Sequence, residues 1–153
     1  QIDMVSVEAM LSPRTQAIII NSPNNPSGVV YTVETLKKLR RLLEDKIMDY
    51  GHTIYLISDE PYRELAYGVE VPWIPEIWND TIVCYSYSKS LSLPGERIGY
   101  LCIPSECDDF QMLFDAAVVA NRILGYVNAP SLMQRAVASA VSADSERGFT
   151  VRT

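Results

Sequence analysis

The sequence predicts an α/β fold, with a mostly parallel sheet and helices on both of its faces. Three short apolar runs, at residues 17–20, 54–58 and 81–87, have the length and the β-branched content of buried strands. An amphipathic pattern over residues 32–50 separates the first two runs, and strands that alternate with helices form parallel sheets. The run at 98–103 follows the third strand with no helical pattern between them, so we expect this last strand to pair antiparallel.

Signals at both ends delimit the predicted helices. In the helix over residues 32–50, apolar side chains recur at spacings of three and four, Thr32 is placed to cap the N-terminus and Gly51 follows the last turn. A second helix is expected after Ser105, which would cap it. A third is expected to begin near Pro130. Both carry a series of apolar side chains, which is typical of an amphipathic helix.

The composition is that of a globular protein of about one domain. The chain has 153 residues, of which 48% are hydrophobic and 21% charged. Its net charge of −6 disfavours nucleic acid and anionic membranes as partners. It has neither an apolar run of 18 residues nor a leader, so we expect no membrane span, no signal peptide and a cytoplasmic location. The three cysteines fit no metal or redox spacing, so we expect free thiols and no metal site.

Polar motifs follow three of the predicted strands at their C-terminal ends, where ligands bind in open α/β sheets. A lysine that is desolvated there can present a neutral amine to an aldehyde. Neighbouring hydroxyls and a guanidinium are the donors that a phosphate dianion requires. An aldehyde and a phosphate together describe pyridoxal phosphate. The motifs are, in chain order, Asn25-Pro26-Ser27-Gly28, Asp59-Glu60-Pro61-Tyr62 and Ser86-Tyr87-Ser88-Lys89, and Arg97 follows the last of them.

The pair Ser86 and Lys89 also matches the S-x-x-K pattern of serine β-lactamases and penicillin-binding proteins, in which the serine attacks a carbonyl. Those enzymes carry S-D-N and K-T-G motifs as well. Here the nearest string is Ser58-Asp59-Glu60, and Lys-Thr-Gly does not occur. The pair also follows a strand, whereas the serine enzymes have it at a helix start. These differences disfavour a serine nucleophile.

The ordered set of three motifs resembles the class I/II aminotransferases, which are fold type I enzymes that depend on pyridoxal phosphate. The resemblance implies catalytic roles for Lys89, Asp59 and Tyr62. Lys89 would form the internal aldimine and then carry a proton between substrate and cofactor. Asp59 would hold the pyridine nitrogen protonated, which makes the ring an electron sink.

The same resemblance implies the remaining cofactor contacts. Asn25 and Tyr62 would donate hydrogen bonds to the phenolic oxygen of the cofactor. Ser86, Ser88 and Arg97 would bind its phosphate. The segment before Arg97 contains Pro94 and Gly95, which allow a tight turn that brings the guanidinium back toward the lysine.

Family members are considerably longer than this chain. The chain begins with Gln1 and ends without a clear closing element, so residues 1–153 are expected to be one partial domain. The resemblance makes it the central or second half of the large cofactor domain, without the N-terminal part and the small C-terminal domain. The parent would be a homodimer that transfers an amino group between an amino acid and a 2-oxo acid. The isolated piece is expected to be inactive.

Several alternatives stay open at this point. A lyase of the same fold, such as an aminocyclopropane-carboxylate synthase or a cysteine-sulfur lyase, would share these motifs. A non-catalytic interaction domain could keep the scaffold, although the presence of Lys89 and Asp59 favours an enzyme. A piece of the domain could also self-associate through its uncovered sheet. The motifs name neither the amino donor nor the acceptor.

Overall fold

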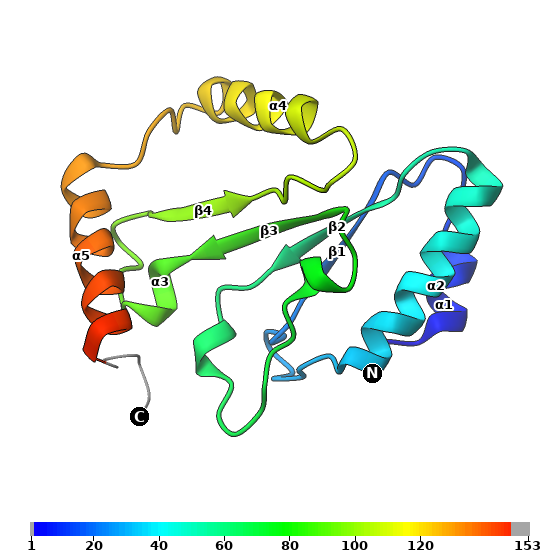
Figure 1. Cartoon of the computed structure of the whole chain (residues 1–153), viewed down its shortest axis with the longest axis horizontal. Helices are drawn as coiled ribbons and strands as arrows, with labels where there is room; N and C mark the ends of the chain where they lie inside the picture. The colour runs from blue at the N-terminus through cyan, green and yellow to red at the C-terminus, as the bar shows by residue number, and fades with distance from the viewer. Residues whose placement is uncertain (1, 148–153) are drawn as a thin grey trace.

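The structure is a computed structural model that describes residues 2–147. A four-stranded sheet in the order β1-β2-β3-β4 runs through its centre (Figure 1). The first three strands are parallel and β4 is antiparallel to β3, which confirms the predicted α/β fold and its reversed last strand. Each strand begins and ends within one residue of its predicted bounds. The strands are β1 (Ala17–Asn21), β2 (Tyr55–Asp59), β3 (Thr81–Ser86) and β4 (Gly99–Cys102).

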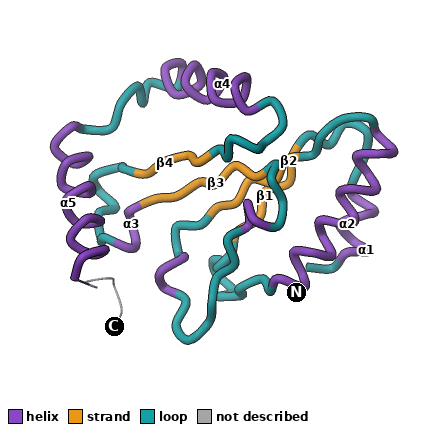
Figure 2. Tube along the Cα trace, in the orientation of Figure 1, coloured by secondary structure: helices purple, strands orange, loops and turns teal. Residues whose placement is uncertain are grey.

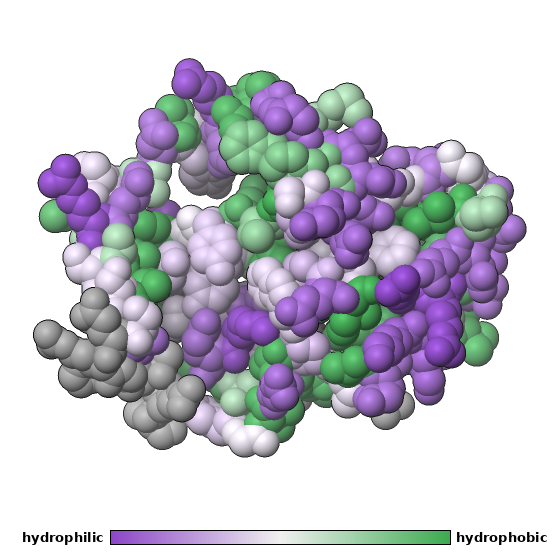
Figure 3. Space-filling view, viewed as in Figure 1, coloured by the Kyte–Doolittle hydropathy of each residue, from purple (hydrophilic) through white to green (hydrophobic). Residues whose placement is uncertain are grey.

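The long helix α2 (Val33–Tyr50) forms as the sequence predicts. The Thr32 side chain accepts a hydrogen bond from the Thr35 N–H at 3.2 Å, and Gly51 ends the helix with a left-handed φ of 73°. A side chain at position 51 would be strained, because L-residues rarely adopt this conformation. The charged side of α2 faces outward, where Figure 3 shows hydrophilic side chains.

The core lies between α2 and one face of the sheet. Alternate residues of β2 and β3 are buried on this face, as the period of a half-covered strand requires. Three leucines of α2 pack against them. The buried apolar cluster consists of Ile20, Leu36, Leu39, Leu43, Ile54, Leu56, Ile74 and Trp78.

A short helix that the sequence analysis did not predict, α1 (Met4–Met10), packs beside α2. Asp3 caps it, and the Lys46 ammonium of α2 lies 2.9 Å from the Glu8 carboxylate. Two turns of helix carry too little periodicity to be distinguished from a loop in a single sequence. The tube in Figure 2 shows α1 and α2 side by side, next to the strands.

The other two helices lie near β3 and β4, and most of their described side chains are exposed (Figure 1). They are α4 (Phe110–Ile123) and α5 (Ser131–Arg147). The start of α5 confirms the prediction near Pro130, but the prediction that Ser105 caps α4 is wrong, because its N-cap residue is Asp109. Hydrogen bonds hold the preceding segment as a loop instead. The Asp108 N–H donates to Asp80 at 2.8 Å, and the Thr53 hydroxyl donates to Asp108 at 2.9 Å.

The sheet face opposite α2 is partly uncovered among the described residues. Ile19 of β1 is 72% exposed and Leu101 of β4 is 49% exposed. The three cysteines are free thiols, of which Cys107 is buried. No helix in the described part of the chain has the length and the apolar character to cross a membrane. Over the same residues, no cluster of His, Cys, Asp and Glu is suited to hold a metal ion.

His52, the single histidine of the sequence, should titrate above its ordinary pKa of 6.5. Its two ring nitrogens lie 3.0 Å from the Thr53 and Pro13 carbonyl oxygens, and these hydrogen bonds, Thr53 first, favour the protonated ring and raise the pKa. The stability that these bonds contribute is therefore fully present below the unfolded pKa and is lost as the pH rises through the folded pKa. An NMR pH titration of the ring protons measures this pKa, and a value at or below 6.5 would contradict the two bonds.

Candidate functional site

The three parallel strands bring their C-terminal ends to one edge of the sheet. Asn21 ends β1 and pairs in register with Asp59, which ends β2, and Asp59 pairs with Cys84 of β3. This arrangement is what allows motifs far apart in the sequence to meet. Each of the three polar motifs that the sequence analysis selected begins at or just beyond this edge.

Asp59 is half-buried on the sheet face opposite α2. Desolvation raises the pKa of its carboxyl group above the ordinary value. The Asn21 amide donates to Asp59 Oδ2 at 3.2 Å and to the Asp59 carbonyl oxygen at 2.9 Å. Among the described residues no hydrogen bond reaches Oδ1, so one carboxylate oxygen is left for a ligand.

Asn25, Tyr62 and Lys89 come together beside the ends of β1 and β3. The Asn25 amide donates to the Tyr62 hydroxyl at 2.8 Å, and the Lys89 ammonium lies 5.8 Å from the centroid of the Tyr62 ring. Lys89 itself is exposed, so the described residues do not desolvate it as the sequence analysis expected. The structure therefore places the predicted reactive lysine over the ring of a predicted cofactor-binding tyrosine.

Two of the predicted phosphate ligands lie at the start of the short helix α3 (Tyr87–Ser90). The pair Ser86 and Lys89 is therefore at a helix start, which corrects the expected difference from the serine enzymes, and the missing S-D-N and K-T-G motifs carry that distinction. Ser86 is its N-cap, and the Ser88 N–H donates to Ser86 Oγ at 3.2 Å. The two hydroxyl oxygens are 2.7 Å apart. Beneath them the buried Tyr85 hydroxyl donates to Ser90 Oγ at 2.7 Å, which fixes α3 to β3. The hydroxyls at this turn can donate to an anion.

Arg97 is exposed, and its guanidinium donates to the Pro94 carbonyl oxygen at 2.8 Å. The chain turns tightly before it, since the Glu96 N–H bonds back to the Leu93 carbonyl at 3.4 Å, as the Pro-Gly segment predicts. Arg97 has a left-handed φ of 51°. This conformation is uncommon for a residue with a side chain and marks a turn that its surroundings hold in place.

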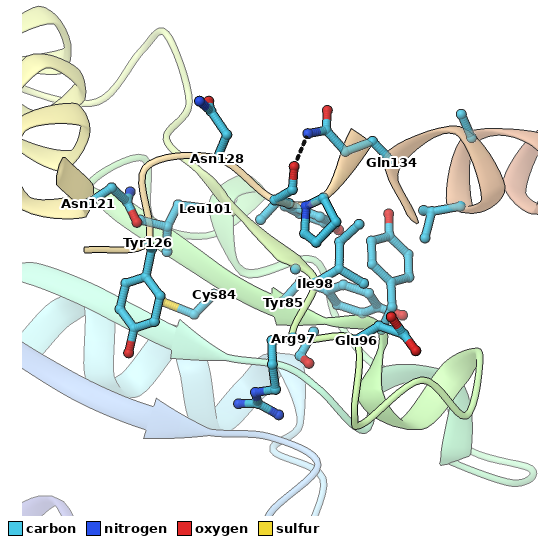
Figure 4. Close-up of a pocket in the computed structure, with 18 of the residues that line it drawn as sticks. Cys84, Tyr85, Glu96, Arg97, Ile98, Leu101, Asn121, Tyr126, Asn128 and Gln134 are labelled. Atoms are coloured by element: carbon cyan, nitrogen blue, oxygen red, sulfur yellow. Dashed lines mark hydrogen bonds between the residues drawn. The ribbon is translucent and has the colours of Figure 1, made fainter. Parts of the chain in front are cut away.

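An open cavity of about 1310 Å³ lies beside β3 and β4 (Figure 4). Asp59, Ser86 and Arg97 line it together. In Figure 4, Tyr126, which the sequence analysis did not select, reaches from the segment before α5 toward Cys84. The space-filling view shows a hollow between α4, α5 and the strands (Figure 3).

The predicted site residues therefore fall into two groups. Asp59, Ser86 and Arg97 share the larger cavity, whereas Asn25 and Tyr62 line a smaller one of about 400 Å³. Lys89 and Ser88 line neither cavity, although Lys89 lies over the Tyr62 ring. Asn21 forms a hydrogen bond with one member of each group, Asp59 and Asn25.

The sequence analysis missed two sets of polar residues at this edge. The first is Asn21, whose only signal was its position directly after a buried strand, as for Asp59. The second is an ion pair between the buried Glu60 and the half-buried Arg63, in which Glu60 Oε2 lies 2.9 Å from Arg63 Nη1 and Glu60 Oε1 accepts from Ser58 at 2.7 Å. The ion pair had a signal too, because Glu60 and Arg63 are three residues apart.

Comparisons with known proteins agree on the kind of protein. The family described as aminotransferase class I and II matches residues 1–152. A probable aspartate/prephenate aminotransferase of Aquifex aeolicus is 38% identical over 111 residues, which are 69% of this chain and 27% of that protein.

Two solved structures extend the likeness to the fold. An aminotransferase of Eubacterium rectale is 55% identical with a TM-score of 0.85, over 88% of this chain and 34% of that chain. A PLP-dependent aminotransferase of Streptococcus suis is 29% identical with a TM-score of 0.64, over 85% of this chain and 31% of that chain. The chain thus spans between about a quarter and a third of the length of its relatives.

Proposed function

The chain belongs to the class I and II aminotransferase family, and from this premise we propose that it carries the lysine and most of the ring-binding and phosphate-binding side chains of a pyridoxal-phosphate site. The family depends on this cofactor, which supplies an aldehyde and an electron-withdrawing ring. The observation that carries the proposal is that Lys89, Asp59 and their polar partners lie along one edge of the sheet.

The side chains present fit this cofactor by their chemistry. Asp59 has a carboxylate oxygen free of hydrogen bonds from the described residues, and it can hold a proton on the ring nitrogen. Ser86, Ser88 and Arg97 offer donors to a phosphate, and the Arg97 fork can bind two of its oxygens. Lys89 is exposed and can approach an aldehyde from solvent.

Asn25 and Tyr62 already share a hydrogen bond of 2.8 Å. In our proposal both turn their donors to the phenolic oxygen of the cofactor. Lys89 would hold the aldehyde of the cofactor and, as a free amine, would take and return the substrate proton. The Lys89 ammonium lies over the Tyr62 ring, and this contact favours a position of the lysine at this end of the site.

We further propose that residues 1–153 are one partial domain of a longer aminotransferase. The short span relative to the relatives supports this, as does the uncovered sheet face at Ile19. The parent would act on an amino acid and a 2-oxo acid, as a homodimer in the cytoplasm. The chain alone would then be inactive, because the N-terminal part and the small C-terminal domain that the resemblance implies would lie outside it.

Reductive labelling tests the proposal directly. The chain has four lysines, and the other three lie on α2, so selectivity can be read within one molecule. We expect saturable visible absorbance on adding pyridoxal phosphate and, after borohydride reduction, a modified peptide that contains Lys89. The lysines are Lys37, Lys38, Lys46 and Lys89.

Two variants control this experiment. Lys89→Ala should remove the absorbance and the labelled peptide, whereas Lys38→Ala, which changes an exposed lysine of α2, should leave both unchanged. Equal labelling of all four lysines, or an unchanged signal in Lys89→Ala, would overturn the proposal.

A further inference from the structure

Asn21 connects the two groups of candidate site residues. Its Nδ2 donates to Asp59 Oδ2 at 3.2 Å and to the Asp59 carbonyl at 2.9 Å. Its Oδ1 accepts from the Asn25 backbone N–H at 2.7 Å and from the Asn24 amide at 3.4 Å. An amide has two N–H donors and one carbonyl acceptor, so both ends of this side chain are in use.

We infer that Asn21 is a positioning residue, which sets the orientation of the Asp59 carboxylate and holds the Asn25 loop in register with it. The inference rests on the proposed function, since it assigns Asp59 and Asn25 to one cofactor. With Oδ2 held by the amide, the carboxylate cannot rotate freely, and Oδ1 is the oxygen that stays available. A hydrogen bond to only one oxygen therefore orients the other.

The same bond acts on the ionisation of Asp59. Desolvation raises the Asp59 pKa, while donation from Asn21 favours the carboxylate and opposes that rise. The other titratable groups near Asp59 are the Cys84 thiol beside it in register, the adjacent Glu60 carboxylate and the Arg97 guanidinium across the cavity. None of them donates a hydrogen bond to Asp59 in the described structure. Removal of the Asn21 amide should therefore change the Asp59 pKa.

Two substitutions separate the functions of the amide. Asn21→Ala removes both the donor to Asp59 and the acceptor for the Asn25 N–H. Asn21→Asp keeps an acceptor for that N–H but presents a second carboxylate to Asp59. Ser27→Ala serves as the control, because it removes the 2.6 Å bond from the Ser27 hydroxyl to Asn24 Oδ1 in the same loop and touches neither Asn21 nor Asp59.

The first measurement needs no cofactor. Carbon-detected NMR titration of the full chain should show the Asp59 pKa about one unit higher in Asn21→Ala than in the wild type, the shift that loss of one bond to a charged group produces. In Asn21→Asp the two carboxyls titrate as a coupled pair, and the upper of their two pKa values should lie higher still. In Ser27→Ala, Asp59 should titrate as in the wild type. An unchanged Asp59 pKa in Asn21→Ala would overturn the inference.

The second measurement is the dissociation constant for pyridoxal phosphate, followed by absorbance. Asn21→Ala should raise this dissociation constant by about tenfold. A pKa shift with an unchanged dissociation constant would overturn the link between Asn21 and the cofactor. If the wild-type chain takes up no cofactor, the proposed function fails for this chain, and the titration alone then decides whether Asn21 holds Asp59.

Discussion

Replacing Arg63 with methionine should lower the free energy of unfolding by about 3 to 5 kcal/mol, the usual cost of leaving one partner of a buried ion pair alone. The Glu60 side chain is 1% exposed, and Arg63 Nη1 lies 2.9 Å from its Oε2. Without Arg63, the only hydrogen bond left to this carboxylate among the described residues is the 2.7 Å bond from Ser58. A buried charge with a single neutral donor is strongly disfavoured.

Arg63 also holds the loop that follows β2. Its guanidinium donates to the Pro72 and Val71 carbonyl oxygens at 3.1 and 2.7 Å, and it lies 5.4 Å from the centroid of the Trp73 ring. Methionine fills part of the same volume but has no donors. The loop carbonyls would then lose their partners together with the carboxylate, which adds to the expected loss.

Chemical denaturation followed by circular dichroism measures this loss. Arg40→Met is the matched control, because Arg40 and Glu44 also form a 2.8 Å ion pair, but with side chains 49% and 44% exposed. We expect the control to change stability by less than about 1 kcal/mol. The double variant Glu60→Gln/Arg63→Met should recover part of the loss, since its buried group is neutral. Similar losses for Arg63→Met and Arg40→Met would contradict the argument.

Substituting alanine for Gly99 should destabilise the fold by at least about 2 kcal/mol, in the range of overpacked sites. A Cβ at this position would overlap the Tyr85 carbonyl oxygen and would lie 3.2 Å from the Ser86 Cα. Both are backbone atoms of the neighbouring strand and cannot rotate away. The first pair of the β3–β4 ladder, Ser86 with Gly99, would have to separate.

The effect should reach the candidate phosphate site, because Ser86 lies on one side of that pair and Arg97 two residues before the other. Hydrogen exchange at the β3 and β4 amides should quicken in Gly99→Ala, and denaturation should give the loss of stability. Gly95→Ala is the control, since nothing lies within 4 Å of a Cβ there and its φ is not positive. Equal behaviour of the two variants would show that the close approach at Gly99 is tolerated.

The sheet was predictable because its strands are apolar runs that turn-forming residues bound on each side. The Asn-Ser-Pro-Asn-Asn segment at the end of β1 and Asp59-Glu60-Pro61 at the end of β2 stop the strands abruptly, so their ends agree with the predicted ends within one residue. The start of α4 was not predictable in this way. Ser105 has the chemistry of a cap, but the contacts of Asp108 with Asp80 and Thr53 are long-range and delay the helix.

The site shows the same division between local and long-range information. Three strand-end motifs predicted which side chains lie at the edge, because parallel strands must end there together. How those side chains divide between two cavities was not predictable, since it depends on loop paths and on the side-chain orientation of Lys89 and Arg97. Asn21 was missed for a related reason, because its proposed role depends on its cross-strand neighbour Asp59 and no sequence motif marks it.

The antiparallel pairing of β4 with β3 has a consequence for how the site assembles. Lys89 and Arg97 both lie in the hairpin connection between these strands, residues 87–98. Contacts in such a connection have low contact order, so little chain entropy is lost when they form. Asp59 and Asn21 meet only after a crossover through α2 has closed, which is slower. The lysine and its arginine can thus take up their relative positions as a local unit, before the carboxylate and the amide of the other strands reach them.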